Sequence, residues 1–153
     1  MVGVGPGGPQ PMPRSAARPR RPRSPPPGLA EEERPFLHDE IMRGVPARKV
    51  KRLIERGVLG VKQVHRIIPE RTFNRRIANN EALKPAEADG IARLIRVAEL
   101  ARRVFRDEDF AREFLRLPNP ALGNRIPSEL AETEAGAREV EAIITRIAYG
   151  DYT

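Results

Sequence analysis

The feature that most constrains the fold of this chain is a succession of apolar residues at helical spacing, interrupted by proline and glycine. Val50, Leu53 and Ile54 fall on one face of a helix that Gly57 ends. The same spacing over VKQVHRII stops at Pro69. No segment alternates apolar and polar residues as a half-buried strand does. The chain is therefore predicted to be all-α.

A third short segment, ERTFNRRIANN, follows Pro69 and is polar and basic. Phe73 and Ile77 form an apolar pair one helical turn apart, and the long polar side chains lie mostly off that line. Three short helices with tight turns and a basic third helix are typical of a helix-turn-helix. Arginine can bond guanine, asparagine can bond adenine, and threonine and the other arginines suit phosphates. The residues expected to contact DNA are Arg71, Thr72, Asn74, Arg75 and Arg76.

The second half of the chain is expected to contain the longest helix, over residues 86–106. Two apolar stripes in that segment predict burial on more than one side. Asp107 is a predicted N-cap for the next helix, and Pro127 is compatible with a single turn. Thr133 is predicted to cap the final helix, and Gly150 is predicted to end it in a left-handed conformation.

Charge and proline content divide the chain further. Residues 36–83 carry eleven Lys and Arg against five Asp and Glu, whereas residues 84–153 carry eleven against thirteen. The basic block indicates a polyanionic partner such as DNA, and its alternative is a solvated, arginine-rich helical surface. Residues 1–35 hold ten of the sixteen prolines and few apolar side chains, which predicts a disordered Pro/Arg/Gly-rich tail. That tail is either an arm that contacts DNA or, the favoured alternative, translated upstream sequence.

The inventory of catalytic residues is poor. His38, in a segment expected to be loosely ordered, and His65, expected in a half-buried structural role, have no partners at metal-ligand spacing. The serines are isolated, and no glycine-rich phosphate loop precedes a helix. The sequence predicts a protein that binds rather than catalyses, with no metal site and no cofactor. Without cysteine or a bilayer-length apolar run, a cytoplasmic protein with no membrane partner is expected.

Two tyrosines, Tyr149 and Tyr152, stand within the last five residues of the printed sequence. Such rings, which have an apolar body and a polar tip, are favoured anchors at protein interfaces. Asp151 adds negative charge between them, and a terminal carboxylate on Thr153 is expected to add more. The alternative for Tyr149 is packing back onto the long helix.

Three motifs follow one another in the second half. PNPALGNRIP spans residues 118–127, TEAGAREV spans 133–140 and RIAYG spans 146–150. In order and spacing they resemble the toxin-binding domain of the Xre/MbcA/ParS antitoxins, in which a second glycine commonly stands at the position of Asn124. The resemblance covers about residues 84–153, and the helix-turn-helix upstream is in the family's usual place.

The resemblance implies the antitoxin of a toxin–antitoxin system. Its toxin would have a RES domain that degrades NAD or uses it for ADP-ribosylation, and the C-terminal domain of the antitoxin would obstruct the NAD cleft. The helix-turn-helix would repress the operon by binding operator DNA. Assemblies of the family are commonly heterotetramers, in which an antitoxin homodimer carries two toxins. Residues 1–35 have no counterpart in the family pattern.

The resemblance also suggests a contact surface. The acidic tip is expected to enter an arginine-lined pocket of the toxin, flanked by contacts from Arg125, Glu129 and Arg138. Arg138 has Glu134, one turn earlier, as an alternative partner, and Leu122 is more readily a core residue than a contact. The predicted toxin-binding residues are Asn119, Leu122, Arg125, Glu129, Arg138, Tyr149, Gly150, Asp151, Tyr152 and Thr153.

These inferences divide the chain into three parts. Residues 1–35 are the predicted tail, residues 36–83 the DNA-binding and dimerisation region, and residues 84–153 the toxin-binding domain. One alternative is a stand-alone helix-turn-helix repressor whose C-terminal half only dimerises. Another is a small NAD-handling enzyme, against which the poor catalytic inventory counts.

Overall fold

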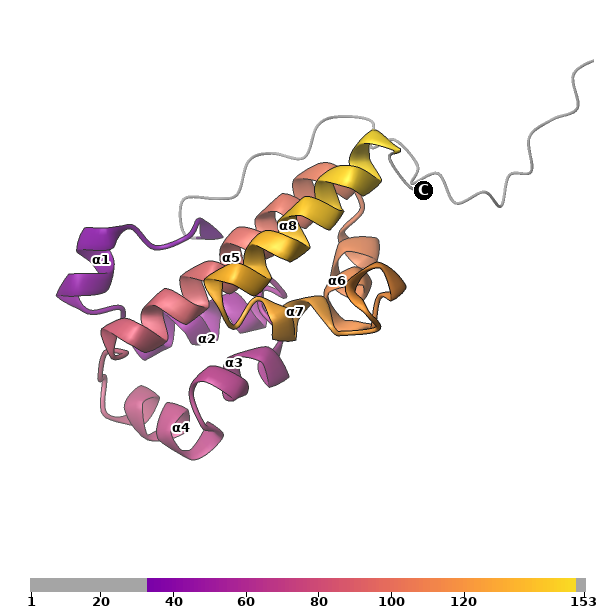
Figure 1. Cartoon of the computed structure of the whole chain (residues 1–153). Coiled ribbons are helices and arrows are strands. Elements are labelled where there is room, and N and C mark those ends of the chain that lie inside the picture. The colour runs from indigo at the N-terminus through magenta and orange to yellow at the C-terminus, as the bar shows by residue number, and fades with distance from the viewer. Residues whose placement is uncertain (1–32, 151–153) are drawn as a thin grey trace, which may run out of the picture.

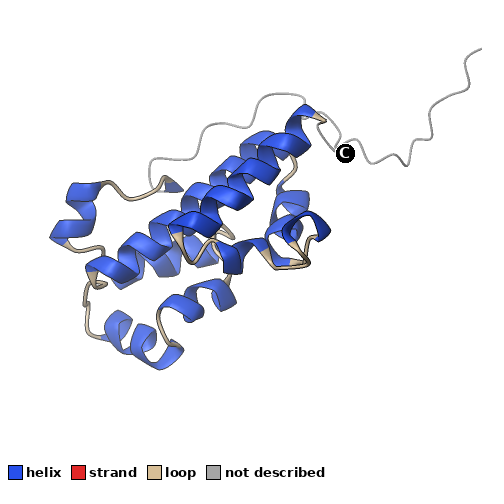
Figure 2. Cartoon of the chain, viewed as in Figure 1, coloured by secondary structure: helices blue, strands red, loops and turns tan. Residues whose placement is uncertain are grey.

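The computed structural model describes residues 33–150, and within that range every regular element is a helix (Figure 2). Extended pairing within it is limited to isolated bridges between Pro46 and Ala82 and between Asn119 and Arg125. The predicted all-α fold is confirmed. Residues 1–32 of the predicted tail and residues 151–153 lie outside the described residues.

Four short helices form the first half of the structure. They are α1 (His38–Arg43), α2 (Ala47–Glu55), α3 (Val61–Ile67) and α4 (Glu70–Ala78) (Figure 1). Gly57 follows α2 with φ of 76°, a conformation that glycine adopts without strain. His38 opens α1, because the Glu40 carboxylate accepts a hydrogen bond from the Leu37 N–H and starts that helix. The expectation that His38 lies in a loosely ordered segment is therefore wrong.

The second half is built on two long helices. α5 spans Pro85–Phe105 and α8 spans Glu134–Tyr149. Between them lie α6 (Glu108–Arg116), the short 3₁₀ helix η2 (Pro120–Leu122) and α7 (Pro127–Leu130). The predicted long helix and the predicted single turn at Pro127 are both confirmed.

The helix ends follow the predicted caps. The Asp107 carboxylate accepts a hydrogen bond from the Phe110 N–H at 3.0 Å, and the Thr133 hydroxyl accepts one from the Gly136 N–H at 3.0 Å. Each bond satisfies one of the N–H groups that the first turn of a helix leaves without an intrahelical partner. Gly150 ends α8 with φ of 70°, in the left-handed region.

α5 is the central element of the fold. Ten of its residues are buried, from Ala88 to Phe105, and this burial on several faces agrees with its two apolar stripes. α8 lies along α5 and runs in the same direction, while α6 and α7 return the chain between them (Figure 1). Parallel helices require such a return, so α6, η2 and α7 are positioned against the α5–α8 pair.

Backbone hydrogen bonds connect the linker before α2 to the linker after α4. The Leu83 N–H donates to the Val45 carbonyl at 2.8 Å, and the Ala47 N–H donates to the Glu81 carbonyl at 3.1 Å. Val45 and Leu83 are both buried in the core. The α4 helix is therefore anchored at its C-terminal end to the start of α2.

Candidate DNA-binding and toxin-binding surfaces

The third helix of the predicted helix-turn-helix, α4, presents a polar face to solvent. Arg71, Asn74 and Arg75 are exposed, and Thr72 is half-buried. On the opposite side, Phe73 is buried and meets the ring of His65 edge-on, with 5.7 Å between the ring centroids. The helix therefore offers two guanidinium groups and one amide outward while an aromatic contact holds it to α3.

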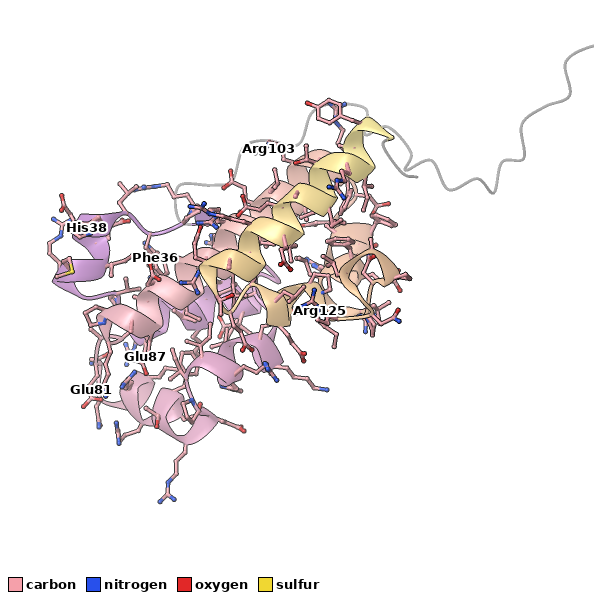
Figure 3. All side chains as sticks on the ribbon, viewed as in Figure 1. Phe36, His38, Glu81, Glu87, Arg103 and Arg125 are labelled. Carbon is pink, nitrogen blue, oxygen red and sulfur yellow. The ribbon has the colours of Figure 1, made fainter. Side chains whose placement is uncertain are left out.

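Arg76 is an exception among the predicted DNA contacts. It is only 6% exposed, and its guanidinium is paired with the Glu87 carboxylate at the start of α5, close to α4 (Figure 3). A side chain held inward by a carboxylate cannot reach a base or a phosphate. The prediction that Arg76 contacts DNA is corrected on this ground.

The loop between α6 and α7 is held by its own hydrogen bonds. The Asn119 side chain accepts from the Ala121 N–H at 2.8 Å, and its backbone N–H donates to the Arg125 carbonyl at 3.1 Å. Asn124 has φ of 61°, in the left-handed region that asparagine and glycine adopt more readily than other residues. Asn119 thus has a structural role as the cap of η2, whatever further contact it makes.

Two predicted toxin contacts in this region differ in exposure. Leu122 is 4% exposed and belongs to the core, so its prediction as an interface residue is corrected. Arg125 is exposed on the same loop. Its Nε donates to the Leu122 carbonyl at 2.7 Å, and its Nη2 lies 3.5 Å from the Glu139 carboxylate. These bonds hold the Arg125 guanidinium at the surface beside α8.

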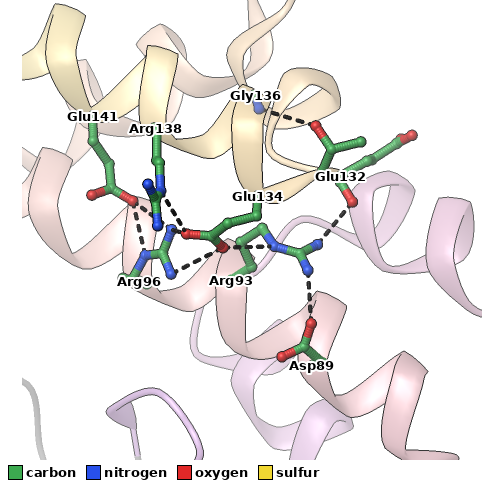
Figure 4. A network of polar contacts seen from close by, with 9 residues as sticks. Asp89, Arg93, Arg96, Glu132, Glu134, Gly136, Arg138 and Glu141 are labelled. Carbon is green, nitrogen blue, oxygen red and sulfur yellow. Dashed lines mark hydrogen bonds and ion pairs between the residues drawn. The ribbon is translucent and has the colours of Figure 1, made fainter.

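A network of arginines and carboxylates connects α5 to the start of α8 (Figure 4). Arg96 donates to Glu134 at 2.9 Å and to Glu141 at 2.8 Å, while Arg93 donates to Asp89 at 2.7 Å. The Arg93 side chain is only 14% exposed and also donates to the Glu132 carbonyl at 2.8 Å. The two long helices are therefore joined by charged hydrogen bonds as well as by their apolar faces.

Glu134 is the acceptor that most of this network shares. Hydrogen bonds from Arg96 hold the pKa of its carboxyl below the ordinary value of 4.5. Arg138 also approaches this carboxylate, at 3.4 Å. Arg138 thus makes the pair foreseen as its alternative, but its side chain is 78% exposed and remains accessible to a partner.

A second set of ion pairs connects the helix-turn-helix to α7 and the segment after it. Arg66 of α3 is paired with Glu132, and its Nη1 lies 3.6 Å from the Glu129 carboxylate. Glu129, a predicted toxin contact, is exposed in α7. This link was not predictable from the sequence, because the partners are separated by more than sixty residues.

The end of α8 is uncovered. Tyr149 is 81% exposed, the largest exposed fraction among the large apolar and aromatic side chains of residues 33–150. A Cβ added at Gly150 would meet no heavy atom within 4 Å. Tyr149 therefore does not pack onto α5. The predicted contacts Asp151, Tyr152 and Thr153 lie outside the described residues.

The two histidines, His38 and His65, lie in α1 and α3. Among residues 33–150, no group of three or more His, Cys, Asp or Glu side chains is placed to hold a metal ion. His65 Nδ1 lies 3.3 Å from the Ile68 carbonyl, in agreement with its expected structural role. In the same range, none of the helices combines the length and apolar character that a bilayer span requires.

A basic helix-turn-helix joined to a helical domain with an uncovered end defines a two-domain binding protein, and comparison with known proteins identifies its class. Residues 36–99 match the antitoxin Xre-like helix-turn-helix domain, and residues 100–150 match the antitoxin Xre/MbcA/ParS C-terminal toxin-binding domain. The two matches meet inside α5. The predicted boundary after residue 83 remains a prediction.

Three relatives carry the name antitoxin Xre. The chain is 31% identical over 114 residues to the protein of Pseudomonas putida, and the match covers 74% of this chain and 72% of the relative. It is 37% identical over 87 residues to the protein of Yersinia enterocolitica, and the match covers 56% of this chain and 59% of the relative. It is 29% identical over 126 residues to the protein of Photorhabdus laumondii, and the match covers 80% of this chain and 85% of the relative.

The chain belongs to the Xre/MbcA/ParS family of antitoxins. It is thus the antitoxin of a toxin–antitoxin system, with a helix-turn-helix for DNA and a domain for a toxin. The matched C-terminal domain is described as a toxin-binding domain, which favours this function over a stand-alone repressor. The prediction that the chain is not an enzyme is confirmed by its membership of a family of antitoxins.

Proposed function

We propose that the chain neutralises a RES-domain toxin by placing the segment from Tyr149 to Thr153 in the toxin's NAD cleft. The observation that carries the proposal is the 81% exposure of Tyr149 at the uncovered end of α8. A tyrosine held at the end of a rigid helix loses little conformational freedom when a partner buries it. Asp151 gives the segment a negative charge suited to a pocket that receives phosphates.

Residues beside this segment would complete the contact. Arg138 is exposed on α8, and Arg125 and Glu129 are exposed on the preceding loop and on α7. With Asn119, they form the proposed flanking contacts, while Leu122 supports the loop from the core. Gly150 ends α8 in a left-handed conformation, immediately before the rest of the proposed segment in the sequence.

The helix-turn-helix supplies the second part of the proposal. Asn74 of α4 would read a base edge of operator DNA in the major groove, with Arg71, Arg75 and Thr72 at phosphates. A homodimer carrying two toxins would present two such helices to a palindromic operator in the cytoplasm. The chain would then repress its own operon as well as inhibit the toxin.

Toxin inhibition is tested with the full chain, a version ending at Ile147 and the point variant Tyr149→Ala. Each is mixed with the RES-domain toxin encoded beside the antitoxin gene, and binding and NAD consumption or ADP-ribosyl transfer are measured. We expect binding to be retained and inhibition to be lost in both altered chains. Met42→Ala, which truncates an apolar side chain that is 61% exposed in α1, is the matched control and should inhibit normally. Full inhibition by the version ending at Ile147 would contradict the proposal.

A further inference from the structure

A groove among the described residues lies where the helix-turn-helix meets the C-terminal domain. It has a volume of about 680 Å³ and is bordered on one side by the α2–α3 turn and the start of α3. Its other side is formed by α6, by Ile126 and by α7. Clefts of this volume are in the range that binds ligands or partner side chains. Tyr149, Gly150 and the residues of α4 do not line this groove.

The groove has an apolar floor and a cationic rim. Leu59, Leu115 and Ile126 contribute apolar surface, and the rim carries Lys62, Arg66, Arg112 and Arg116 against a single acidic residue, Glu129. Such a lining favours an occupant with an apolar group flanked by carboxylates.

Two of the rim cations are poorly neutralised by the chain itself. Arg66 is already paired with Glu132 and Glu129. By contrast, the Arg116 side chain is 67% exposed and lies 3.9 Å from the Glu113 carboxylate. An ion pair of this length at an exposed site contributes little free energy. Lys62 is exposed and forms no ion pair with any residue from 33 to 150. These two cations have charge available for a partner.

A hydroxyl group is also available to an occupant of the groove. Ser128, at the second position of α7, is 8% exposed and lines the groove. Its side chain makes no hydrogen bond within residues 33–150. The hydroxyl is not among the fully buried unpartnered atoms of residues 33–150, so it is accessible to solvent and can donate a hydrogen bond to a bound group or accept one from it.

We propose that this groove docks an acidic, partly apolar segment of the toxin, in addition to the contact made by the end of α8. The toxin is the partner because α6, Ile126 and α7 belong to the matched toxin-binding domain, so a toxin seated on that domain lies beside the groove. This inference rests on the proposed function. A segment in the groove would also touch the α2–α3 turn, so the bound toxin would hold the helix-turn-helix and the C-terminal domain in one orientation.

The proposal separates affinity from inhibition. Lys62→Glu/Arg116→Glu replaces two cations with two carboxylates and is expected to weaken toxin binding about tenfold at 0.1 M salt, with a smaller loss at higher salt. Inhibition by the double variant should be complete once its concentration is far above the new Kd, because the end of α8 is unchanged. Toxin binding is measured by calorimetry, and thermal unfolding is recorded for each variant.

Lys51→Glu is the matched control for charge reversal. Lys51 is exposed on α2, outside the groove, and lies 4.0 Å from Glu55, much as Arg116 lies 3.9 Å from Glu113. Its toxin affinity should stay within about twofold of the wild-type value. A second groove variant, Ser128→Ala, removes a hydroxyl that bonds nothing in the free chain. It should fold normally and bind the toxin about fivefold more weakly.

The outcomes distinguish the groove from the proposed function. If Lys62→Glu/Arg116→Glu binds the toxin as tightly as the wild-type chain, and the wild-type chain inhibits, the groove proposal is overturned and the proposed function stands. If the wild-type chain does not bind the RES-domain toxin, both are overturned. An equal loss of affinity in Lys51→Glu would also overturn the groove proposal, because the effect would then be one of total charge.

Discussion

Arg76 of α4 and Glu87 of α5 form an ion pair in which both side chains are largely removed from solvent, with 7% and 16% of their surface exposed. The same Glu87 carboxylate accepts a hydrogen bond from the Lys84 N–H at 2.8 Å. One carboxylate therefore starts α5 and also holds the helix proposed to read DNA. The orientation of α4 is set by this pair on one side and by Phe73 on the other.

The first prediction is that Arg76→Ala destabilises the fold. Removing one partner of a buried pair leaves the other charge without compensation, and the free energy of unfolding should fall by about 3 kcal/mol. Urea denaturation followed by circular dichroism measures this change. The exchanged pair Arg76→Glu/Glu87→Arg should recover part of the loss, since it restores opposite charges at the same place.

Arg75→Ala is the matched control for that experiment. Arg75 is on the same helix, but its side chain is 62% exposed and lies 4.0 Å from Glu81. Exposed pairs contribute little, so its removal should change stability by about 0.5 kcal/mol or less. Equal destabilisation by Arg75→Ala and Arg76→Ala would show that the pair with Glu87 does not hold α4.

A second prediction concerns DNA. Arg71→Ala and Arg75→Ala should each weaken operator binding and lower the slope of log Kd against log salt concentration by about one, because each arginine neutralises a phosphate in the proposed complex. Fluorescence anisotropy with a duplex from the operon's promoter measures the slope. Arg103→Ala, which removes an arginine that is 66% exposed on α5, is the control and should leave the slope unchanged. An unchanged slope in both α4 variants would place the DNA contact elsewhere.

Local signals in the sequence were sufficient for most of the helices and their ends, but α1 was not predicted. The spacing of apolar residues predicted the long helix, and the chemistry of Asp107, Thr133 and Gly150 predicted caps that the structure contains. Such features depend on residues a few positions apart, which one sequence displays directly. The three motifs of the second half were sufficient for the family.

Contacts between distant residues were not predictable in this way. Arg76 and Arg75 are adjacent and identical in type, yet one is buried and the other is exposed. The difference arises from Glu87, whose position depends on how α5 packs against α4. The link from Arg66 to Glu132 and the groove containing Ser128 likewise require the arrangement of the two domains.

The third prediction concerns the glycine in the TEAGAREV motif. A Cβ at Gly136 would lie 1.9 Å from the Leu130 carbonyl oxygen, a backbone atom that cannot move freely. Gly136→Ala should therefore force α8 away from α7 and destabilise the chain by about 3 kcal/mol. Thermal or urea unfolding measures the loss. This motif glycine would then be explained by packing rather than by a contact with the toxin.

Gly150→Ala provides the comparison for Gly136. Gly150 has φ of 70°, but a Cβ there would meet nothing within 4 Å. Its substitution should cost only the strain of a left-handed alanine, about 1 kcal/mol. If Gly136→Ala is as well tolerated as Gly150→Ala, the close approach of α7 to α8 is not a constraint on the fold.

The last prediction concerns acid. Hydrogen bonds from Arg96 lower the pKa of Glu134 below 4.5, and the Leu37 N–H lowers the pKa of Glu40 in the same direction. A carboxyl with a lower pKa in the folded chain than in the unfolded chain stabilises the fold when it is ionised. That stabilisation is fully present above pH 4.5 and is lost as the pH falls through the folded pKa. Unfolding temperature should therefore decrease steadily below pH 4.5.

Glu134→Gln identifies the contribution of this carboxylate. At pH 7 the variant should unfold at a lower temperature than the wild-type chain, because Arg93, Arg96 and Arg138 lose a shared anionic partner. In acid the two proteins should converge, since protonated Glu134 is as neutral as glutamine. A difference that persists unchanged below the folded pKa would assign the effect to packing at the start of α8. Convergence would show that the charge on Glu134 joins α5 to α8.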